Sequence, residues 1–248
     1  KVSDRKVRDE WKPLWGKRAV VEDHFNELVI DLVNPAGQPE RMQLVVRGYN
    51  DGFAFCYKIP DGKGPCVNVQ SELTAYNFAG DYTAWFYNGE NHNIGPEKLT
   101  ETDGTRLPVM TVKAGDKHYM AIHEACLETG APLVLQSKGG ESLFSVASKP
   151  TSLSPGYTSA WRVVLYGTTP GVLTDSHLLE LLNPDPDSRY DFSWVKPGLA
   201  VWDWRINGAV WDGFTYGMSY PSWVRMVDFA AEQGFKYLVL DANWYGPE

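Results

Sequence analysis

The sequence predicts a mostly β protein, with an antiparallel β domain followed by the first β-α-β unit of a truncated (β/α)8 TIM barrel. Two observations support this prediction. From residue 11 to residue 167, strand-like runs and turn signals recur about every eight to twelve residues, the spacing typical of a sandwich or barrel. Residues 194–248 then change to a strand, a helix and a second strand.

The antiparallel region begins with clear strand patterns. Residues 28–33 and 42–47 are strand-like runs, and Asn50-Asp51-Gly52 predicts a tight turn before the strand at 53–59. Further strands are expected at residues 66–69, 73–78, 83–87, 109–113, 119–123, 133–136, 143–147 and 161–166. Residues 1–10 are highly charged, so no strand is expected there.

A short helix at residues 176–182 precedes the expected domain boundary. Asn183-Pro184-Asp185-Pro186-Asp187 interrupts this helix because proline disfavours helical backbone at the residue before it. We therefore expect a β domain at 1–183, a short rigid linker at 184–196 and the start of a barrel at 197–248. The last strand would have an open apolar edge, so we expect the rest of the barrel beyond Glu248, and the N-terminal part of the β domain before Lys1.

The predicted barrel unit has a helix at 223–233. Trp223, Met226, Val227 and Ala230 lie on one face of this helix, and Gly234 suits its C-terminal cap. A strand comes before the helix, and the second, almost wholly apolar strand at 237–241 follows it. This order predicts a right-handed crossover between parallel strands.

Candidate site residues follow the two strands of this unit. Asp203 and Asp241 lie at the carboxyl ends, where α/β enzymes place their ligand sites, with Trp202 or Trp204 and Trp244 expected beside them. Carboxylates accept hydrogen bonds from sugar hydroxyls, and indole rings can cover a sugar ring. A sugar pocket is one interpretation. In the other, an Asp caps the following loop and the Trp side chains pack beneath it.

Composition excludes several classes of function. The formal net charge is −8 without a Lys/Arg-rich run, which argues against nucleic acid as a partner. No run is long and apolar enough to span a membrane. The three Cys show no CxxC spacing, so a zinc or redox site is not expected. Cys56 and Cys66 flank a turn and are either disulfide-bonded or free.

Two further polar segments have structural and functional interpretations. His123-Glu124 lacks a third ligand at metal spacing, so we expect a structural role. Glu90-Asn91-His92-Asn93 forms a polar loop whose oxygens could bind calcium, or which is simply solvated.

An ordered set of motifs resembles glycoside hydrolase family 97. The motifs are W-K-P-L-W-G at 11–16, H-F-N-E-L at 24–28, N-D-G-F-A-F at 50–55, I-H-E-A at 122–125, W-R at 161–162, S-W-V-K-P-G at 193–198 and D-F-A-A-E-Q-G-F at 228–235. The resemblance implies an antiparallel β-super-sandwich, a catalytic (β/α)8 barrel and a small C-terminal β domain.

The same resemblance implies calcium-dependent hydrolysis of α-glucosides or α-galactosides, in a periplasmic or extracellular protein. Glu90 is the nearest match to the glutamate that the family's N-terminal domain contributes to calcium, and Trp202 matches a Trp at the pocket floor. The catalytic carboxylates are expected beyond Glu248, so we expect residues 1–248 alone to be inactive. The alternative is a non-catalytic carbohydrate-binding or interaction module.

Overall fold

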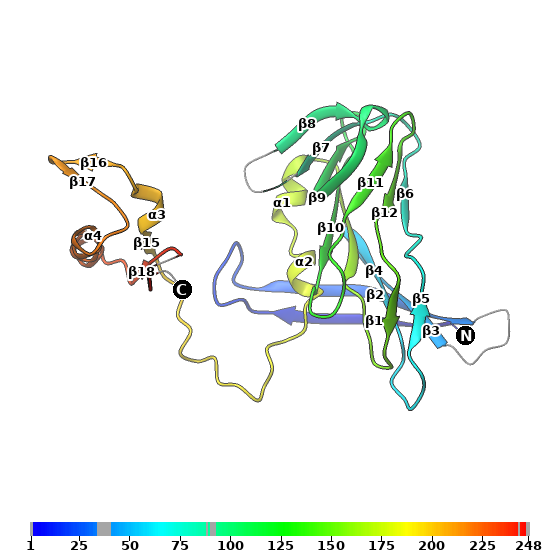
Figure 1. Ribbon diagram of the computed structural model, residues 1–248. Helices are drawn as coiled ribbons and strands as arrows, with labels where there is room; N and C mark the ends of the chain where they lie inside the picture. Colours follow the sequence, from blue (N-terminus) through cyan, green and yellow to red (C-terminus); the bar gives the residue numbers. More distant parts are fainter. Residues whose placement is uncertain (1, 34–40, 88, 90–92, 243, 247–248) are drawn as a thin grey trace. The chain divides into compact units, whose positions relative to one another are not determined.

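The computed structural model describes residues 2–33, 41–87, 89, 93–242 and 244–246 (Figure 1). The chain divides into two compact units, Lys1–Asp185 and Pro186–Glu248. The first unit is almost entirely β, whereas the second combines short strands with helices. None of the helices in the described part of the chain could cross a membrane.

A twelve-stranded antiparallel sheet forms most of the first unit. Its main path runs β1-β2-β3-β4-β14-β10-β9-β11-β12-β6, and β7 joins it beside β9 with β8 on its other side. The strands are β1 (Val2–Trp11), β2 (Val21–Val33), β3 (Arg41–Tyr49), β4 (Gly52–Lys58), β6 (Ala75–Asn77), β7 (Thr83–Tyr87), β8 (Asn93–Lys98), β9 (Asp103–Lys113), β10 (Tyr119–Ala125), β11 (Leu135–Lys138), β12 (Leu143–Val146) and β14 (Trp161–Gly167). β5 (Val67–Val69) and β13 (Thr151–Leu153) form a separate pair.

The expectation that residues 1–10 form no strand is wrong. β1 pairs with β2 along its whole length, from Val2 opposite Ile30 to Trp11 opposite Val21. It is an edge strand that is exposed along nearly all its length, and charged side chains are what such edges carry. Cross-strand charge pairing takes the place of an apolar face, and Arg5 donates to the carboxylate of Glu27 over 2.6 Å.

The Asn50–Asp51 turn is confirmed, with Tyr49 opposite Gly52 in the β3–β4 pairing. Gly52 is required there because a Cβ would lie 2.3 Å from the backbone oxygen of Val164 on β14. Strands β8 and β13 and the helix α1 (Pro170–Asp175) were not expected. The helix expected at 176–182 is shorter, α2 (Leu178–Leu181).

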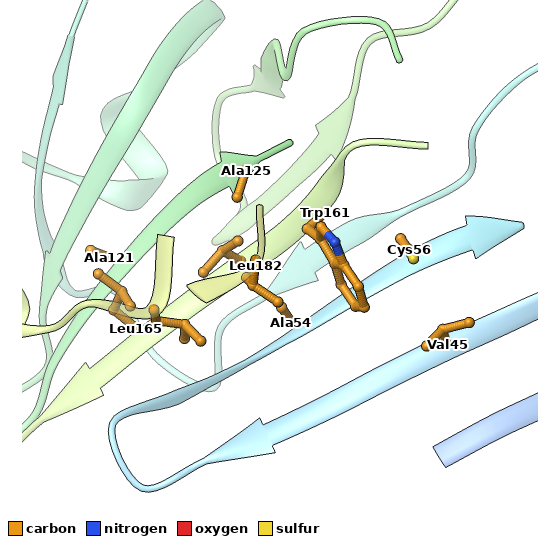
Figure 2. Close-up of a cluster of buried hydrophobic side chains, with 10 residues drawn as sticks. Val45, Ala54, Cys56, Ala121, Ala125, Trp161, Leu165 and Leu182 are labelled. Atoms are coloured by element: carbon orange, nitrogen blue, oxygen red, sulfur yellow. The ribbon is translucent and has the colours of Figure 1, made fainter. Parts of the chain in front are cut away.

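Two apolar clusters form the interior of the first unit. Figure 2 shows side chains of one cluster, which come from β3, β4, β10, β14 and the segment of α2. Leu178 and Leu182 of that segment are buried in it. The second cluster is centred on Met110, Leu135 and Phe144, each fully buried. Antiparallel strands packed over two apolar layers give a sandwich-like architecture.

The three cysteines are free thiols. Cys56 is buried in the first apolar cluster, whereas Cys66 is exposed. The alternative of a disulfide between them is therefore wrong. Side chains alternate between the two faces of a strand, and Cys56 lies on the inward face of β4. Cys66 lies outside the strands, immediately before β5.

The second unit contains the predicted pair of parallel strands. β15 (Ala200–Trp202) pairs in parallel with β18 (Tyr237–Val239), so this prediction is confirmed. Between them lie α3 (Asp203–Ile206), the hairpin of β16 (Val210–Trp211) and β17 (Phe214–Thr215), and α4 (Tyr220–Gln233).

Helix α4 ends as expected at Gly234, whose φ of 72° is left-handed. Met226 and Ala230 are buried, as their spacing predicts. Val227 was expected on the same buried face but is 49% exposed. The buried stripe is narrow because, in the described part of this unit, the helix packs against three short elements, β15, β18 and α3.

Candidate functional site

Asp203 is the centre of the candidate site in the second unit. It follows β15 directly, begins α3 and is completely buried. Its Oδ2 accepts a hydrogen bond from the indole Nε1–H of Trp223 over 2.9 Å. Its Oδ1 accepts one from the backbone N–H of Asp241 over 3.0 Å. The carboxylate therefore joins β15 to α4 and to the end of β18.

Asp241 lies two residues after β18 and is partly buried. Its Oδ1 accepts a hydrogen bond from the backbone N–H of Ala242 over 2.7 Å. In the described part of the chain no hydrogen bond or ion pair to its Oδ2 is present. Asp241 thus presents a partly accessible carboxylate at a position set by Asp203.

The structure places the two candidate tryptophans differently. Trp202 is the last residue of β15, is 37% exposed and has the Arg205 guanidinium 5.1 Å from its ring. Trp244 is 57% exposed, and its ring meets the ring of Tyr245 edge-on at 5.6 Å. The two aspartates are joined by a hydrogen bond, and both indoles remain partly exposed.

Large apolar side chains are exposed over much of the second unit. This set comprises Tyr190, Phe192, Trp194, Val195, Leu199, Trp202, Trp204, Val210, Trp211, Tyr220, Val224, Val227, Phe229, Tyr237, Val239, Trp244 and Tyr245. Exposed apolar surface on this scale is unusual for a soluble domain and marks surface that is normally covered or that binds a ligand.

The proposed calcium ligand Glu90 lies outside the described residues. Among the residues that are described, no three His, Cys, Asp or Glu side chains come together in a way that could hold a metal ion.

Sequence patterns did not reveal a buried charge cluster in the first unit. Arg162 on β14 is 3% exposed and donates to both carboxylate oxygens of Glu72, from Nε over 3.0 Å and from Nη2 over 2.7 Å. Its Nη1 lies 3.5 Å from Oε2 of Glu124, which also accepts the backbone N–H of Leu133. The sequence feature that could have revealed this cluster is the single arginine, Arg162, within an otherwise mostly apolar strand.

Glu124 and His123 have the structural role expected for them. Burial raises the pKa of Glu124, although the Leu133 hydrogen bond and the Arg162 charge oppose the shift. The Nδ1 atom of His123 accepts the backbone N–H of Glu124, and burial lowers the pKa of this imidazole. These contacts fix the end of β10 in the first unit.

A cleft of about 730 Å³ lies above this charge cluster. Glu72 and Arg162 line it together with Tyr57 and Tyr157 and side chains of the β5–β13 arm. The first unit thus offers a cavity that the sequence did not predict.

The first unit is thus a sandwich-like antiparallel β domain, and the second pairs two parallel strands that are followed by Asp203 and Asp241. A family model described as Glycosyl-hydrolase 97 N-terminal matches residues 1–184. The chain belongs to glycoside hydrolase family 97.

Two curated relatives have names that agree with this family. The chain is 27% identical to a retaining alpha-galactosidase of Bacteroides thetaiotaomicron, over 98% of this chain and 42% of the relative. It is 30% identical to a probable retaining alpha-galactosidase of Streptomyces bingchenggensis, over 83% of this chain and 32% of the relative. The chain thus spans less than half the length of these relatives.

Solved structures show the same similarity. A glycoside hydrolase family 97 enzyme from Pseudoalteromonas sp. strain K8, in complex with acarbose, superposes with a TM-score of 0.79 at 26% identity. The match covers 99% of this chain and 40% of that enzyme. The same enzyme is also known as an E480Q variant with panose. A beta-arabinopyranosidase matches at 19% identity with a TM-score of 0.79, which shows the fold alone.

Proposed function

We propose that the protein containing this chain hydrolyses α-glycosides, with α-galactosides or α-glucosides as substrates. The observation that carries this proposal is the contact between Asp203 and Asp241 at the ends of two parallel strands, in a chain that belongs to glycoside hydrolase family 97. The relatives named retaining alpha-galactosidases favour galactosides. The acarbose and panose complexes of the Pseudoalteromonas enzyme favour glucosides.

We propose that the second unit is the start of a (β/α)8 barrel. The parallel β15–β18 pair and the intervening helix α4 have the order of a barrel unit. Further strands beside this pair and further helices around it would cover the apolar side chains that are exposed here, such as Val239 and Phe229. Such cover would remove an open sheet edge that is otherwise prone to aggregate.

In this proposal the candidate residues have separate roles. Asp241 accepts hydrogen bonds from sugar hydroxyls, while Trp202 and Trp244 form apolar walls against the sugar ring. Asp203 is a positioning residue, because both its oxygens are already occupied by Trp223 and the backbone of Asp241.

Bond cleavage in glycosidases requires two carboxyl groups, one to protonate the leaving oxygen and one to activate water or to attack the anomeric carbon. We propose that both lie beyond Glu248. Residues 1–248 would then hold one wall of the sugar pocket and show no turnover of their own.

Calcium dependence and a periplasmic or extracellular location are also proposals, supported by the family resemblance. A calcium ion would be bound by oxygen ligands, with Glu90 as the ligand from this chain.

The test is an assay of the longer protein on p-nitrophenyl α-galactoside and p-nitrophenyl α-glucoside, before and after treatment with a calcium chelator. We expect release of p-nitrophenol from at least one substrate, its loss with chelator and its recovery with added calcium. Glu90→Gln should require more calcium for half-maximal activity, with Glu141→Gln as the exposed control. Absence of activity on both substrates would overturn the glycosidase proposal, and activity unaffected by chelator would overturn the calcium proposal.

A further inference from the structure

The cleft in the first unit has the size and lining of a small-molecule site. Its volume of about 730 Å³ falls within the range of roughly 300–1,000 Å³ that is typical of ligand pockets. Most of its lining is apolar, with Met42, Val69 and Leu153 among the contributors. The tyrosines Tyr57 and Tyr157 add two aromatic side chains.

The floor of the cleft is rigid and polar. Arg162 is held through three of its nitrogens by Glu72 and Glu124, so neither its position nor that of Glu72 depends on a ligand. The backbone N–H of Glu72 also donates to Ser148 Oγ over 2.8 Å. Preorganised polar groups of this kind bind with a small entropic cost.

Unused hydroxyl groups surround this floor. Ser71, Ser152 and Tyr157 line the cleft, and their side-chain hydroxyls make no hydrogen bond to the described part of the chain. A ligand that offers several hydroxyl groups of its own would pair with them, and its apolar faces would contact the tyrosine rings.

The charges exclude a strongly ionic ligand. Arg162 is matched by two carboxylates, Glu72 and Glu124, and the exposed Lys149 at the cleft is a single further positive charge. The groups around the cleft therefore carry two positive and two negative charges. An anion or a cation would gain little attraction from such a balanced set and would still have to lose its hydration. A neutral molecule has no such cost of desolvating a charge.

We propose that this cleft is a second saccharide-binding site, for a neutral oligosaccharide, in the β domain and separate from the proposed barrel pocket. The choice of a saccharide rests on the proposed function, because the ligand has the chemistry of the proposed substrate. Such a site would bind glycan without cleaving it.

The experiment is isothermal titration calorimetry of the 248-residue chain with panose and with melibiose, and with a uronic-acid trisaccharide as the anionic probe. We expect a neutral sugar to bind and the anionic probe to bind at least about tenfold more weakly. Ser152→Trp, which places a large ring in the cleft from an exposed strand position, should weaken binding by at least about tenfold.

Further variants separate the cleft from the second unit. Tyr157→Ala should weaken binding about tenfold, whereas Tyr157→Phe keeps the ring and should remain within about threefold. Trp15→Ala, at an exposed position that does not line the cleft, is the matched control and should bind like the parent chain. Trp244→Ala tests whether the sugar binds the second unit instead. Circular dichroism and thermal denaturation check that each variant is folded.

The outcomes are distinct. If the chain binds no neutral sugar, or if Ser152→Trp binds like the parent chain, the second site is overturned. If Trp244→Ala alone abolishes binding, the sugar occupies the second unit, which overturns this inference and supports the proposed function. Loss of hydrolysis by the longer protein with intact cleft binding would overturn the proposed function alone.

Discussion

The backbone N–H of Asp241 donates a hydrogen bond to Oδ1 of Asp203 over 3.0 Å, so one buried carboxylate sets the ends of two parallel strands. The other oxygen of that carboxylate holds the indole of Trp223 at the start of α4. A strand-end aspartate that was expected to bind sugar is thus buried and fully paired in this structure. The carboxylate that keeps access is its neighbour, Asp241.

Asp203→Ala should destabilise the second unit by about 3 kcal/mol, because the Trp223 indole and the Asp241 amide both lose a charged acceptor. The measurement is urea denaturation followed by tryptophan fluorescence. Asp228→Ala, at an exposed position of α4, is the matched control and should change stability by less than about 0.5 kcal/mol. Equal stability of the two variants would contradict the central position of Asp203.

Glu124→Gln should change how stability depends on pH. Burial raises the pKa of Glu124 above its ordinary value of 4.5, so the folded state holds this proton more tightly than the unfolded state. The stabilising effect of the proton is complete below pH 4.5 and is lost as pH rises through the folded-state pKa. Relative to the parent chain, Glu124→Gln should therefore gain stability as pH rises.

Urea denaturation at a series of pH values between about 4 and 7 measures this difference. Glu141→Gln removes one exposed carboxylate and serves as the control. If Glu124→Gln instead loses stability relative to the parent chain as pH rises, ionised Glu124 is stabilised by Arg162 more than it is penalised by burial.

The three thiols should react with a disulfide reagent at pH 8 in a fixed order. Cys66 is exposed and should react first, and partly buried Cys126 second, since burial raises the pKa of its thiol. Cys56 should react only in denaturant, because burial raises its pKa to about 12. Cys66→Ser should remove the fast phase. A chain that releases no thiol until it is reduced would contradict the free state of these cysteines.

Phe144→Ala should destabilise the first unit by about 3–5 kcal/mol. The side chain is completely buried and its ring contacts those of Phe78 and Phe86, so truncation leaves a cavity in the second apolar cluster. Far-ultraviolet circular dichroism in urea measures the loss. Phe53→Ala, on β4 and 44% exposed, is the control and should cost far less. Similar losses of stability for both variants would contradict the placement of Phe144 in the core of the first unit.

Most strands of the first unit could be predicted because their side chains alternate against an interior. The turn at Asn50–Asp51 and the strand β7 are examples, since a local pattern determines each of them. The strand β1 could not be predicted in this way. It buries almost nothing, and its stability comes from pairing with β2, where Glu27 lies opposite Arg5.

The candidate site could likewise be predicted only in part. Adjacency in sequence placed Asp203 and Asp241 at the ends of strands that pair in parallel, and the structure contains this arrangement. Which carboxylate is buried could not be predicted, because the indole of Trp223 reaches Asp203 from α4, twenty residues further along the chain.

By itself, the sequence determined the β-rich class of the first unit, the parallel strand–helix–strand order of the second and the family, because periodicity and motifs are local properties of the chain. Only the tertiary structure decided which charges meet. Glu72, Glu124 and Arg162 come from three distant segments, and their pairing beneath a cleft depends on strand order and register. Contacts between distant segments decide burial and charge pairing, and no local pattern carries that information.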